Sequence, residues 1–162
     1  IDYASRSKID INNFSTVGEY LESLCLKVKP SLATDGDIPR LAQMAGKTNQ
    51  FNATTIRRDE NDFIRLLKDE TKKVFVFRTR DRFAEQGIVC YIVVDLNLKR
   101  ITDFVMSCRA MGRTLEYFAY EYVTSSLQEA YPIDFKSTAK NGPIKEFLNK
   151  GPNGYTYYKE EI

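Results

Sequence analysis

The sequence contains no histidine, and it has only three cysteines. Without histidine, Ser-His-Asp and Cys-His catalysis and every histidine-containing metal site are excluded. Cys25, Cys90 and Cys108 show no paired spacing, which is typical of a reducing compartment and not of a disulfide framework. No group of acidic residues has the spacing of a metal-binding loop. We therefore expect no metal in this domain.

Long apolar runs and a strong net charge are also missing. The formal net charge is +2, so nothing attracts the whole chain to nucleic acid or to an anionic membrane. No secretory signal and no membrane-spanning run is visible, and we expect a cytoplasmic protein. At 162 residues the chain can form one domain with a real core. Since it begins with Ile1, we expect a piece of a longer protein, with residues 1–14 as a connecting segment and residues 15–162 as a single domain.

The hydrophobic pattern predicts an α/β domain in the order α–β–α–α–β–β–β–α–β–α–β, with an antiparallel middle. The two central strands are near-continuous apolar runs, as expected of strands buried on both faces. Residues 53–57 are read as a short strand or a loop. The expected helices begin near Ser15, Thr34, Asp59, Arg113 and Asn141, and the expected strands are 26–32, 72–80, 87–96, 99–107, 133–137 and 155–158.

The segment Ile101–Val123 is the centre of this pattern, because a strand runs through a short turn into a helix. The helix has apolar residues at spacings of three and four. Glu116 lies in its first turn, where a negative charge suits the positive end of the helix dipole. The expected buried stripe consists of Leu115, Phe118, Ala119, Tyr122 and Leu127.

The turn within this segment is a candidate phosphate site. Free N–H groups at the helix start attract anions, and Gly112 allows close approach of a ligand. Arg109 and Arg113 flank the turn and can each bind a phosphate through two hydrogen bonds. The alternative is an ordinary strand–helix turn with two solvated arginines.

Two other polar segments are open to either a structural or a functional interpretation. Residues 47–52 are rich in amides and hydroxyls, which suits a helix end followed by a loop, or the wall of a pocket. Residues 78–87 form a charged loop between two core strands, and such loops are usually solvated.

The order of elements and the motif Arg109-x-x-Gly112-x-Thr114 resemble the GNAT acyltransferase fold, a mixed, mostly antiparallel sheet flanked by helices. Several further blocks resemble the C-terminal part of FkbH-like proteins of the HAD-IIIC type, over most of residues 17–151. These blocks are Glu19–Leu24, Lys47–Thr55, Asp81–Phe83, Met106–Arg113 and Thr138–Pro143.

This resemblance implies a GNAT-like domain that handles a glyceryl-type acyl group and the phosphopantetheine thiol of an acyl carrier protein or of CoA, in polyketide or related biosynthesis. In the family an N-terminal HAD domain precedes it, and this chain lacks the HAD signature. The implied cofactor-binding residues are Arg109, Ala110, Met111, Gly112, Arg113, Thr114 and Asn141. The third position of the pyrophosphate turn is Thr114 here instead of a small residue.

Cys108 is the sharpest catalytic candidate, because it precedes a helix N-terminus and neighbours Arg109, which both favour a thiolate. It could carry the acyl group as a thioester, or it could be a small core residue at a strand end. For direct transfer to a thiol, Asp81 or Glu85 would act as general base.

The substrate itself has several candidate ligands. Arg82 could hold a carboxylate or phosphate, or pair with Asp81. Amides and hydroxyls could hold glyceryl hydroxyls or an oxyanion; they are Asn49, Gln50, Asn52, Thr54 and Thr55. Two alternative functions remain open: a non-catalytic carrier-docking module and a general CoA-dependent N-acetyltransferase.

Overall fold

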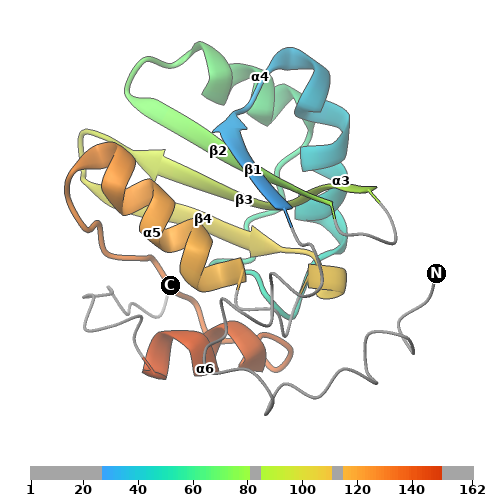
Figure 1. Cartoon of the computed structure of the whole chain (residues 1–162), viewed down its shortest axis with the longest axis vertical. Helices are drawn as coiled ribbons and strands as arrows, with labels where there is room; N and C mark the ends of the chain where they lie inside the picture. Colours follow the sequence, from blue (N-terminus) through green and yellow to red (C-terminus); the bar gives the residue numbers. More distant parts are fainter. Residues whose placement is uncertain (1–26, 81–84, 111–114, 151–162) are drawn as a thin grey trace.

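A computed structural model of the chain describes residues 27–80, 85–110 and 115–150 (Figure 1). The connecting segment 1–14, the helix expected near Ser15 and the strand expected at 155–158 lie outside these residues. The described elements are β1 (Lys27–Leu32), η2 (Asp35–Asp37), α3 (Ile38–Lys47), α4 (Glu60–Lys68), β2 (Lys72–Arg80), β3 (Glu85–Asp95), β4 (Arg100–Met106), η3 (Cys108–Ala110), α5 (Leu115–Leu127) and α6 (Gly142–Lys150).

The four strands form one antiparallel sheet in the order β1-β2-β3-β4. This confirms the predicted α/β class with a mostly antiparallel sheet and flanking helices. The predicted hairpin is β2–β3, but β3 begins at Glu85, two residues earlier than expected. The β2–β3 register shifts after Phe77 and again after Thr79, and Gly87 has a φ of 66°. Glycine suits that position because other residues rarely adopt a positive φ.

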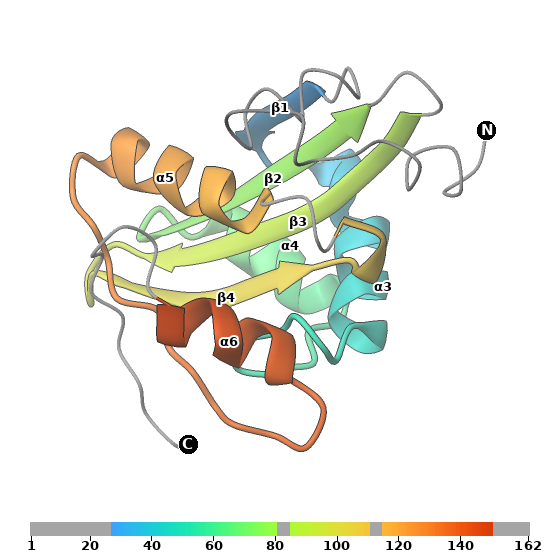
Figure 2. The same ribbon diagram turned by 60° about the horizontal axis from the view of Figure 1, so that its bottom comes forward.

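Side chains alternate across the sheet, which separates two cores. Cys90, Ile92 and Phe104 face one cluster, with α5 and α6. Tyr91 and Val105 face the other, with α3 and α4. Figures 1 and 2 show α5 on one face of the sheet, α3 and α4 on the opposite face, and α6 beside β4. Burial on both faces explains why the central strands read as continuous apolar runs.

On the α3–α4 face, α4 begins where the sequence predicts, whereas the helix expected from Thr34 opens with the 3-10 turn η2 and becomes α-helical only at Ile38. Asp59 caps α4, since its Oδ1 accepts a hydrogen bond of 2.8 Å from the Asp62 backbone N–H. The Asp62 carboxylate accepts one of 2.9 Å from the Asp59 N–H in return. This reciprocal capping box satisfies backbone donors that the first turn leaves free. Pro39 lies in the first turn of α3, where a missing N–H costs nothing.

The free edge of β4 is shared by two short segments. Near its start, Ile101 bridges Ile133 in parallel orientation; near its end, Asn52 bridges Val105 in antiparallel orientation. The Lys136 N–H then bonds to the Ala53 carbonyl at 2.8 Å and not to β4. The prediction of a strand at 133–137 is therefore wrong, because residues 51–53 occupy the part of the β4 edge along which that strand would have continued.

The buried stripe of α5 differs from the prediction. Leu115 and Ala119 are buried as expected, and Tyr122 and Leu127 pack half-buried against the same core. Phe118 lies outside the core, whereas Tyr120 and Val123, which were not predicted, are fully buried. Phe118 is 42% exposed. The Tyr120 hydroxyl donates a 2.9 Å hydrogen bond to the Tyr131 carbonyl. Because that bond satisfies the hydroxyl, a tyrosine can be fully buried where the hydrophobic pattern favoured phenylalanine.

The first turn of α5 contains a partly buried acid. Glu116 has one carboxylate oxygen that is shielded from solvent and has no hydrogen-bond partner. Burial raises its pKa above the usual value, while its own backbone N–H opposes the shift. Desolvation therefore outweighs the stabilisation of the charged carboxylate that we expected from the helix dipole, because removing a carboxylate from water disfavours its charged form.

A buried ion pair anchors the segment before α4 to the sheet. Arg58 donates from Nε and Nη2 to the two oxygens of Asp103, at 2.7 and 2.8 Å. Only 2% of the Asp103 side chain is exposed. The hydrogen bond that Arg58 donates to Asp103 is the main cause that raises the pKa of Arg58. This bidentate ion pair fixes the loop between α3 and α4 on β4.

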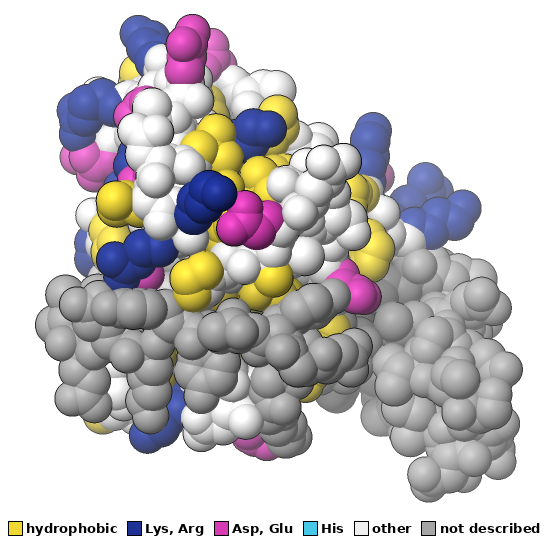
Figure 3. Space-filling view, turned by 90° about the vertical axis from the view of Figure 1, so that its left-hand side faces the viewer, with side chains coloured by type: hydrophobic (Ala, Val, Ile, Leu, Met, Phe, Trp, Pro, Cys, Tyr) yellow, Lys and Arg dark blue, Asp and Glu magenta, His cyan; other side chains and the backbone are white. Residues whose placement is uncertain are grey.

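The surface shows no large field of one charge on the face in Figure 3, where basic and acidic side chains are interspersed with apolar ones. None of the described helices is long and apolar enough to cross a membrane.

Candidate functional site

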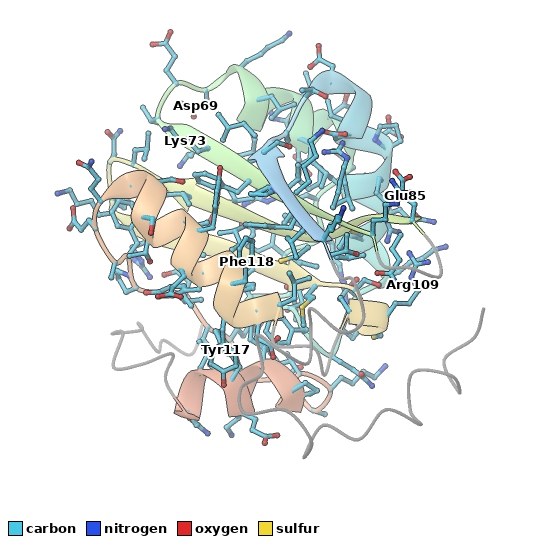
Figure 4. The ribbon with its side chains drawn as sticks, in the orientation of Figure 1. Asp69, Lys73, Glu85, Arg109, Tyr117 and Phe118 are labelled. Carbon is cyan, nitrogen blue, oxygen red and sulfur yellow. The ribbon has the colours of Figure 1, made fainter. Side chains whose placement is uncertain are left out.

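The turn that follows β4 exposes two side chains to solvent, those of Cys108 and Arg109. The Ser107 N–H bonds to the Val89 carbonyl at 2.7 Å, which keeps the chain on the sheet for one more residue. The turn η3 follows, closed by a 2.9 Å bond from the Ala110 N–H to the Ser107 carbonyl. Ala110 is buried, whereas Cys108 and Arg109 are exposed. Arg109 projects from this turn at the rim of the molecule (Figure 4).

A cavity of about 200 Å³ separates this turn from α3. One wall is a single helical stripe, since its α3 residues are spaced by three and four positions. The other wall is the residue pair that follows β4. The lining residues are Arg40, Gln43, Met44, Lys47, Thr48, Ser107 and Cys108.

Cys108 is therefore a surface thiol beside a cavity and not a small core residue. Its Sγ lies 3.7 Å from Oε1 of Gln50, a weak contact in which the thiol donates. Both side chains are exposed. Cys90 is the contrasting case, because it is buried in β3 and burial raises the pKa of its thiol well above the usual value. Of these two thiols, Cys108 is the one that a substrate can reach.

The amide-rich segment after α3 serves mainly to shape its own loop. Asn52 is buried; its Nδ2 donates to the Thr48 carbonyl at 3.2 Å and its Oδ1 accepts from the Thr55 N–H at 2.8 Å. Thr54 donates to the Thr102 carbonyl at 3.0 Å. Asn49 accepts from Arg57. These side chains are held by the protein, and Gln50 is the one whose described contact reaches Cys108.

Thr55 has a φ of 56°, which is unusual for a β-branched residue. The bond from its N–H to Asn52 holds this conformation. Such strain persists only where the surroundings fix it. The loop is thus built to a definite shape next to the cavity.

Asn141, expected at the cofactor, is fully buried. Its Nδ2 donates to the Lys136 carbonyl at 2.7 Å and to the Asn52 carbonyl at 3.3 Å. Its Oδ1 accepts from the Thr138 N–H at 2.9 Å. These contacts give Asn141 a positioning role, because its side chain ties the start of α6 to the loop beside the cavity.

Arg40 is one of three α3 residues, with Gln43 and Met44, that line the cavity and that the sequence did not predict for the site. Its Nε donates to the Ile88 carbonyl at 3.2 Å and its Nη1 to Oε1 of Gln43 at 2.8 Å. Burial is the main cause that lowers its pKa, and the nearby charge of Arg109 adds to this. The spacing of Arg40, Gln43 and Lys47 on one face of α3 was visible in the sequence, but nothing indicated that this face meets the end of β4.

Several predicted site residues lie outside the described part of the chain: Asp81, Arg82, Met111, Gly112, Arg113 and Thr114. Their roles stay predictions. Glu85, the second candidate base, is exposed at the start of β3, on the same side of the molecule as Arg109 (Figure 4). Within residues 27–80, 85–110 and 115–150, no group of three acidic or cysteine side chains could hold a metal ion.

Solved structures with the same arrangement are numerous, although no protein-family model and no curated protein matches the chain. A transcriptional regulator from Bacillus halodurans C-125 is 15% identical, with a TM-score of 0.55 over 84% of this chain and 97% of the other. A mutant of the spermidine N-acetyltransferase SpeG from Vibrio cholerae is 12% identical, with a TM-score of 0.51 over 77% of each chain. A possible acetyltransferase from Clostridium difficile 630 is 14% identical, with a TM-score of 0.50 over 83% of this chain and 97% of the other.

These likenesses define the fold. The chain has the GNAT-like acyltransferase fold that its element order predicts, and two of these three neighbours are described as acetyltransferases. At such low identity, fold alone does not carry a reaction from one protein to another. Function has to be argued from the cavity and the residues around it.

Proposed function

We propose that this chain is the GNAT-like acyltransferase domain of an FkbH-like protein, and that it handles a glyceryl-type acyl group and a phosphopantetheine thiol. The observation that carries the proposal is the exposed Cys108 thiol at the end of β4, beside a cavity of about 200 Å³. The fold and the acetyltransferase neighbours support acyl transfer in general. The five sequence blocks that resemble the FkbH-like pattern support the particular acyl group and carrier.

The proposed chemistry is a thioester exchange. The Sγ of Cys108 attacks the carbonyl carbon of an acyl-pantetheine, the bond from that carbon to the pantetheine sulfur breaks, and the proton lost by Cys108 ends on the released thiol. The reverse sequence loads a second pantetheine. One thioester replaces another, so no oxidant, metal or net proton source is needed. Gln50 contacts Sγ and would hold the thiol in place.

The pantetheine phosphate would be bound by the turn after β4. Arg109 is exposed there and can bind a phosphate bidentately. Ala110 is buried and sets the course of the backbone, while residues 111–114 would complete the site as the sequence resemblance implies. Arg82 would bind a carboxylate or phosphate of the substrate. An acyl carrier protein, a HAD domain of the parent chain and a cytoplasmic location belong to the same proposal.

The decisive experiment is intact-mass spectrometry after incubation with glyceryl-pantetheine. The wild-type chain should gain one glyceryl group, and Cys108→Ser should not gain it as a thioester. Cys25→Ser is the matched control and should still be acylated. Thermal shift with CoA and phosphopantetheine, with Arg109→Ala as control, tests the turn. Acylation that survives Cys108→Ser would contradict the covalent route.

Two neighbours described as acetyltransferases favour a second candidate, a general CoA-dependent N-acetyltransferase. It predicts release of CoA from acetyl-CoA in the presence of an amine acceptor, with no adduct on Cys108. If transfer by the full parent protein is unaffected by Cys108→Ser and this domain alone turns over no donor, the remaining candidate is a carrier-docking module.

A further inference from the structure

One face of β1 carries a row of apolar side chains that no described helix covers. Residues that pair directly in antiparallel strands share a face of the sheet. Pro30 pairs with Phe77 and Leu32 with Phe75, and both phenylalanines belong to the core cluster under α5. Val28 lies two positions before Pro30 and therefore on the same face. Leu32 is nevertheless 51% exposed, and Val28 and Pro30 are only half-buried.

The side of α5 next to this row is also apolar. Phe118 and Tyr122 stack on each other, with ring centroids 6.3 Å apart, and both meet the Phe77 ring edge-on. Phe118 is nevertheless 42% exposed, on the side of α5 toward β1 (Figure 4). Figures 1 and 2 show α5 lying beside β1 without crossing it. These side chains form one exposed apolar surface, the β1–α5 face, which consists of Val28, Pro30, Leu32, Phe118 and Tyr122.

The sequence that precedes β1 has the complementary pattern. The helix expected near Ser15 has apolar residues at spacings of three and four, which predicts an apolar stripe along one side. A helix this short is marginal in water by itself, so it needs a surface to pack against. The stripe consists of Val17, Tyr20, Leu21 and Leu24.

The connection to β1 places this stripe near the β1–α5 face. Two residues separate Leu24 from Lys27, where β1 begins, and connections of about two to six residues are usual between a helix and the next strand. The opposite face of β1 carries Lys27, Lys29 and Ser31, because side chains alternate along a strand. An apolar stripe does not suit that polar face.

The two apolar rows also agree in length. From Val17 to Leu24 a helix rises about 10 Å, at about 1.5 Å per residue. From Val28 to Leu32 a strand extends about 13 Å, at about 3.3 Å per residue. A helix that runs back along β1 would therefore bring Leu24 near the start of the row and Val17 near its end.

We propose that residues 16–25 form a helix whose apolar stripe packs on the β1–α5 face. The occupant of this face is thus a segment of the same chain. A tethered segment has an effective concentration in the millimolar range, which a second copy of the chain reaches only in concentrated solution. This packing goes beyond the proposed acyl transfer and does not depend on it.

Such packing fixes where the polypeptide enters the domain. In the register of the sheet, Pro30 is level with Met106 at the end of β4. The Val28 end of β1 therefore lies on the same side as Cys108, and the Leu32 end lies away from it. Polypeptide before the segment would leave the domain at the Leu32 end. A preceding domain could then be attached without covering the cavity.

Hydrogen exchange of the full chain, read by peptide mass spectrometry, tests whether the segment packs. We expect the amides of residues 20–25 to exchange at least about tenfold more slowly than those of an unstructured chain. Leu32→Ser should speed their exchange several-fold. Leu98→Ser is the matched control, because Leu98 is also exposed but lies in the turn between β3 and β4, and it should change nothing.

The segment itself offers a second matched pair. Leu21→Ser should speed the same exchange several-fold, whereas Glu22→Ser changes a neighbour outside the stripe and should leave the exchange within about twofold of wild type. Unprotected amides in the wild-type chain, or protection that neither Leu32→Ser nor Leu21→Ser reduces, would overturn the proposal.

A designed disulfide identifies the occupant. In a chain with Cys25→Ser and Cys108→Ser, we expect the pair Val17→Cys and Leu32→Cys to join within one chain under oxidised glutathione. The pair Val17→Cys and Leu98→Cys is the control and should stay unlinked. Non-reducing electrophoresis and peptide mass spectrometry read both. Dimers linked through Val17→Cys and Leu32→Cys would assign the face to a second copy, and a pair that stays unlinked would place the segment elsewhere; either result overturns the proposal.

Discussion

The side-chain amide of Asn141 donates a hydrogen bond to the backbone carbonyl of Asn52, 89 positions earlier, at 3.3 Å. This bond joins two sequence blocks that both resemble the same family but are far apart in the chain. It places the start of α6 against the loop that follows α3. Both residues are buried, so water cannot replace the bond.

Asn141→Ala tests this connection. The substitution leaves the Lys136 and Asn52 carbonyls and the Thr138 N–H without their partner, and each buried unsatisfied group costs about 1–3 kcal/mol. We expect the free energy of unfolding to fall by about 3 kcal/mol in urea denaturation. Asn61→Ala, at an exposed position of α4, is the control and should change it by less than about 0.5 kcal/mol. Equal effects would show that Asn141 does not hold the loop.

Asp103→Asn should destabilise the fold more than any surface ion-pair change. It leaves the half-buried Arg58 guanidinium without its carboxylate, and breaking a buried pair costs about 3–5 kcal/mol. The control is Glu129→Gln, which removes the exposed pair with Lys99 and should cost less than about 1 kcal/mol. Denaturation with urea compares the two variants. A cost for Asp103→Asn as small as that of the control would mean that the pair is solvated.

Glu116→Gln should stabilise the protein at neutral pH. Because the pKa of Glu116 is raised in the folded state, its contribution to stability is complete below the unfolded pKa of about 4.3 and is lost as the pH rises through the folded pKa. At pH 7 the variant should melt about 2 °C or more above wild type, and near pH 4 the difference should vanish. Scanning calorimetry at both values checks this, with Glu70→Gln in an exposed turn as control. If the difference in melting temperature between the variant and wild type instead grew toward low pH, the pKa of Glu116 would not be raised in the folded state.

Tyr120→Phe examines the corrected stripe of α5. Loss of the hydroxyl removes the bond to the Tyr131 carbonyl, and we expect a cost of about 1 kcal/mol. Tyr122→Phe makes the same chemical change at a half-buried neighbour on the same helix and should stay within about 0.5 kcal/mol of wild type. If Tyr122→Phe proved the costlier variant, the originally predicted stripe would describe the helix better.

Local pattern was enough to predict most of the fold. The apolar runs of β2 and β3, the start of α4 near Asp59 and the start of α6 near Asn141 are each decided by neighbouring residues, and each was predicted. The exceptions involve contacts distant in sequence. Residues 133–137 look like a strand, but the end of the β4 edge is occupied by residues 51–53. Tyr120 is buried because a carbonyl eleven positions later accepts its hydroxyl.

The residues of the candidate site also fall into two groups: those that the local sequence indicates, and those whose role depends on contacts distant in the sequence. Cys108 and Arg109 were predicted because the strand, turn and following helix are contiguous in the sequence. Asn52 and Asn141 were noticed as polar blocks, yet only the tertiary structure shows that they bind each other and backbone groups. Arg40 carried no local signal, since a charged residue on an amphipathic helix is ordinary until the opposite wall is known.

The occupied edge of β4 also affects how this sheet could meet another polypeptide. An incoming strand would find the β4 backbone already hydrogen-bonded at both ends by residues 51–53 and 132–134. Of the two edges of the described sheet, β1 is the more open, and there Pro30 lacks a donor while Lys27 and Lys29 are exposed. Proline and lysine on an edge strand discourage chance pairing. Both edges of the described sheet therefore disfavour the edge-to-edge pairing through which copies of a β-sheet protein aggregate.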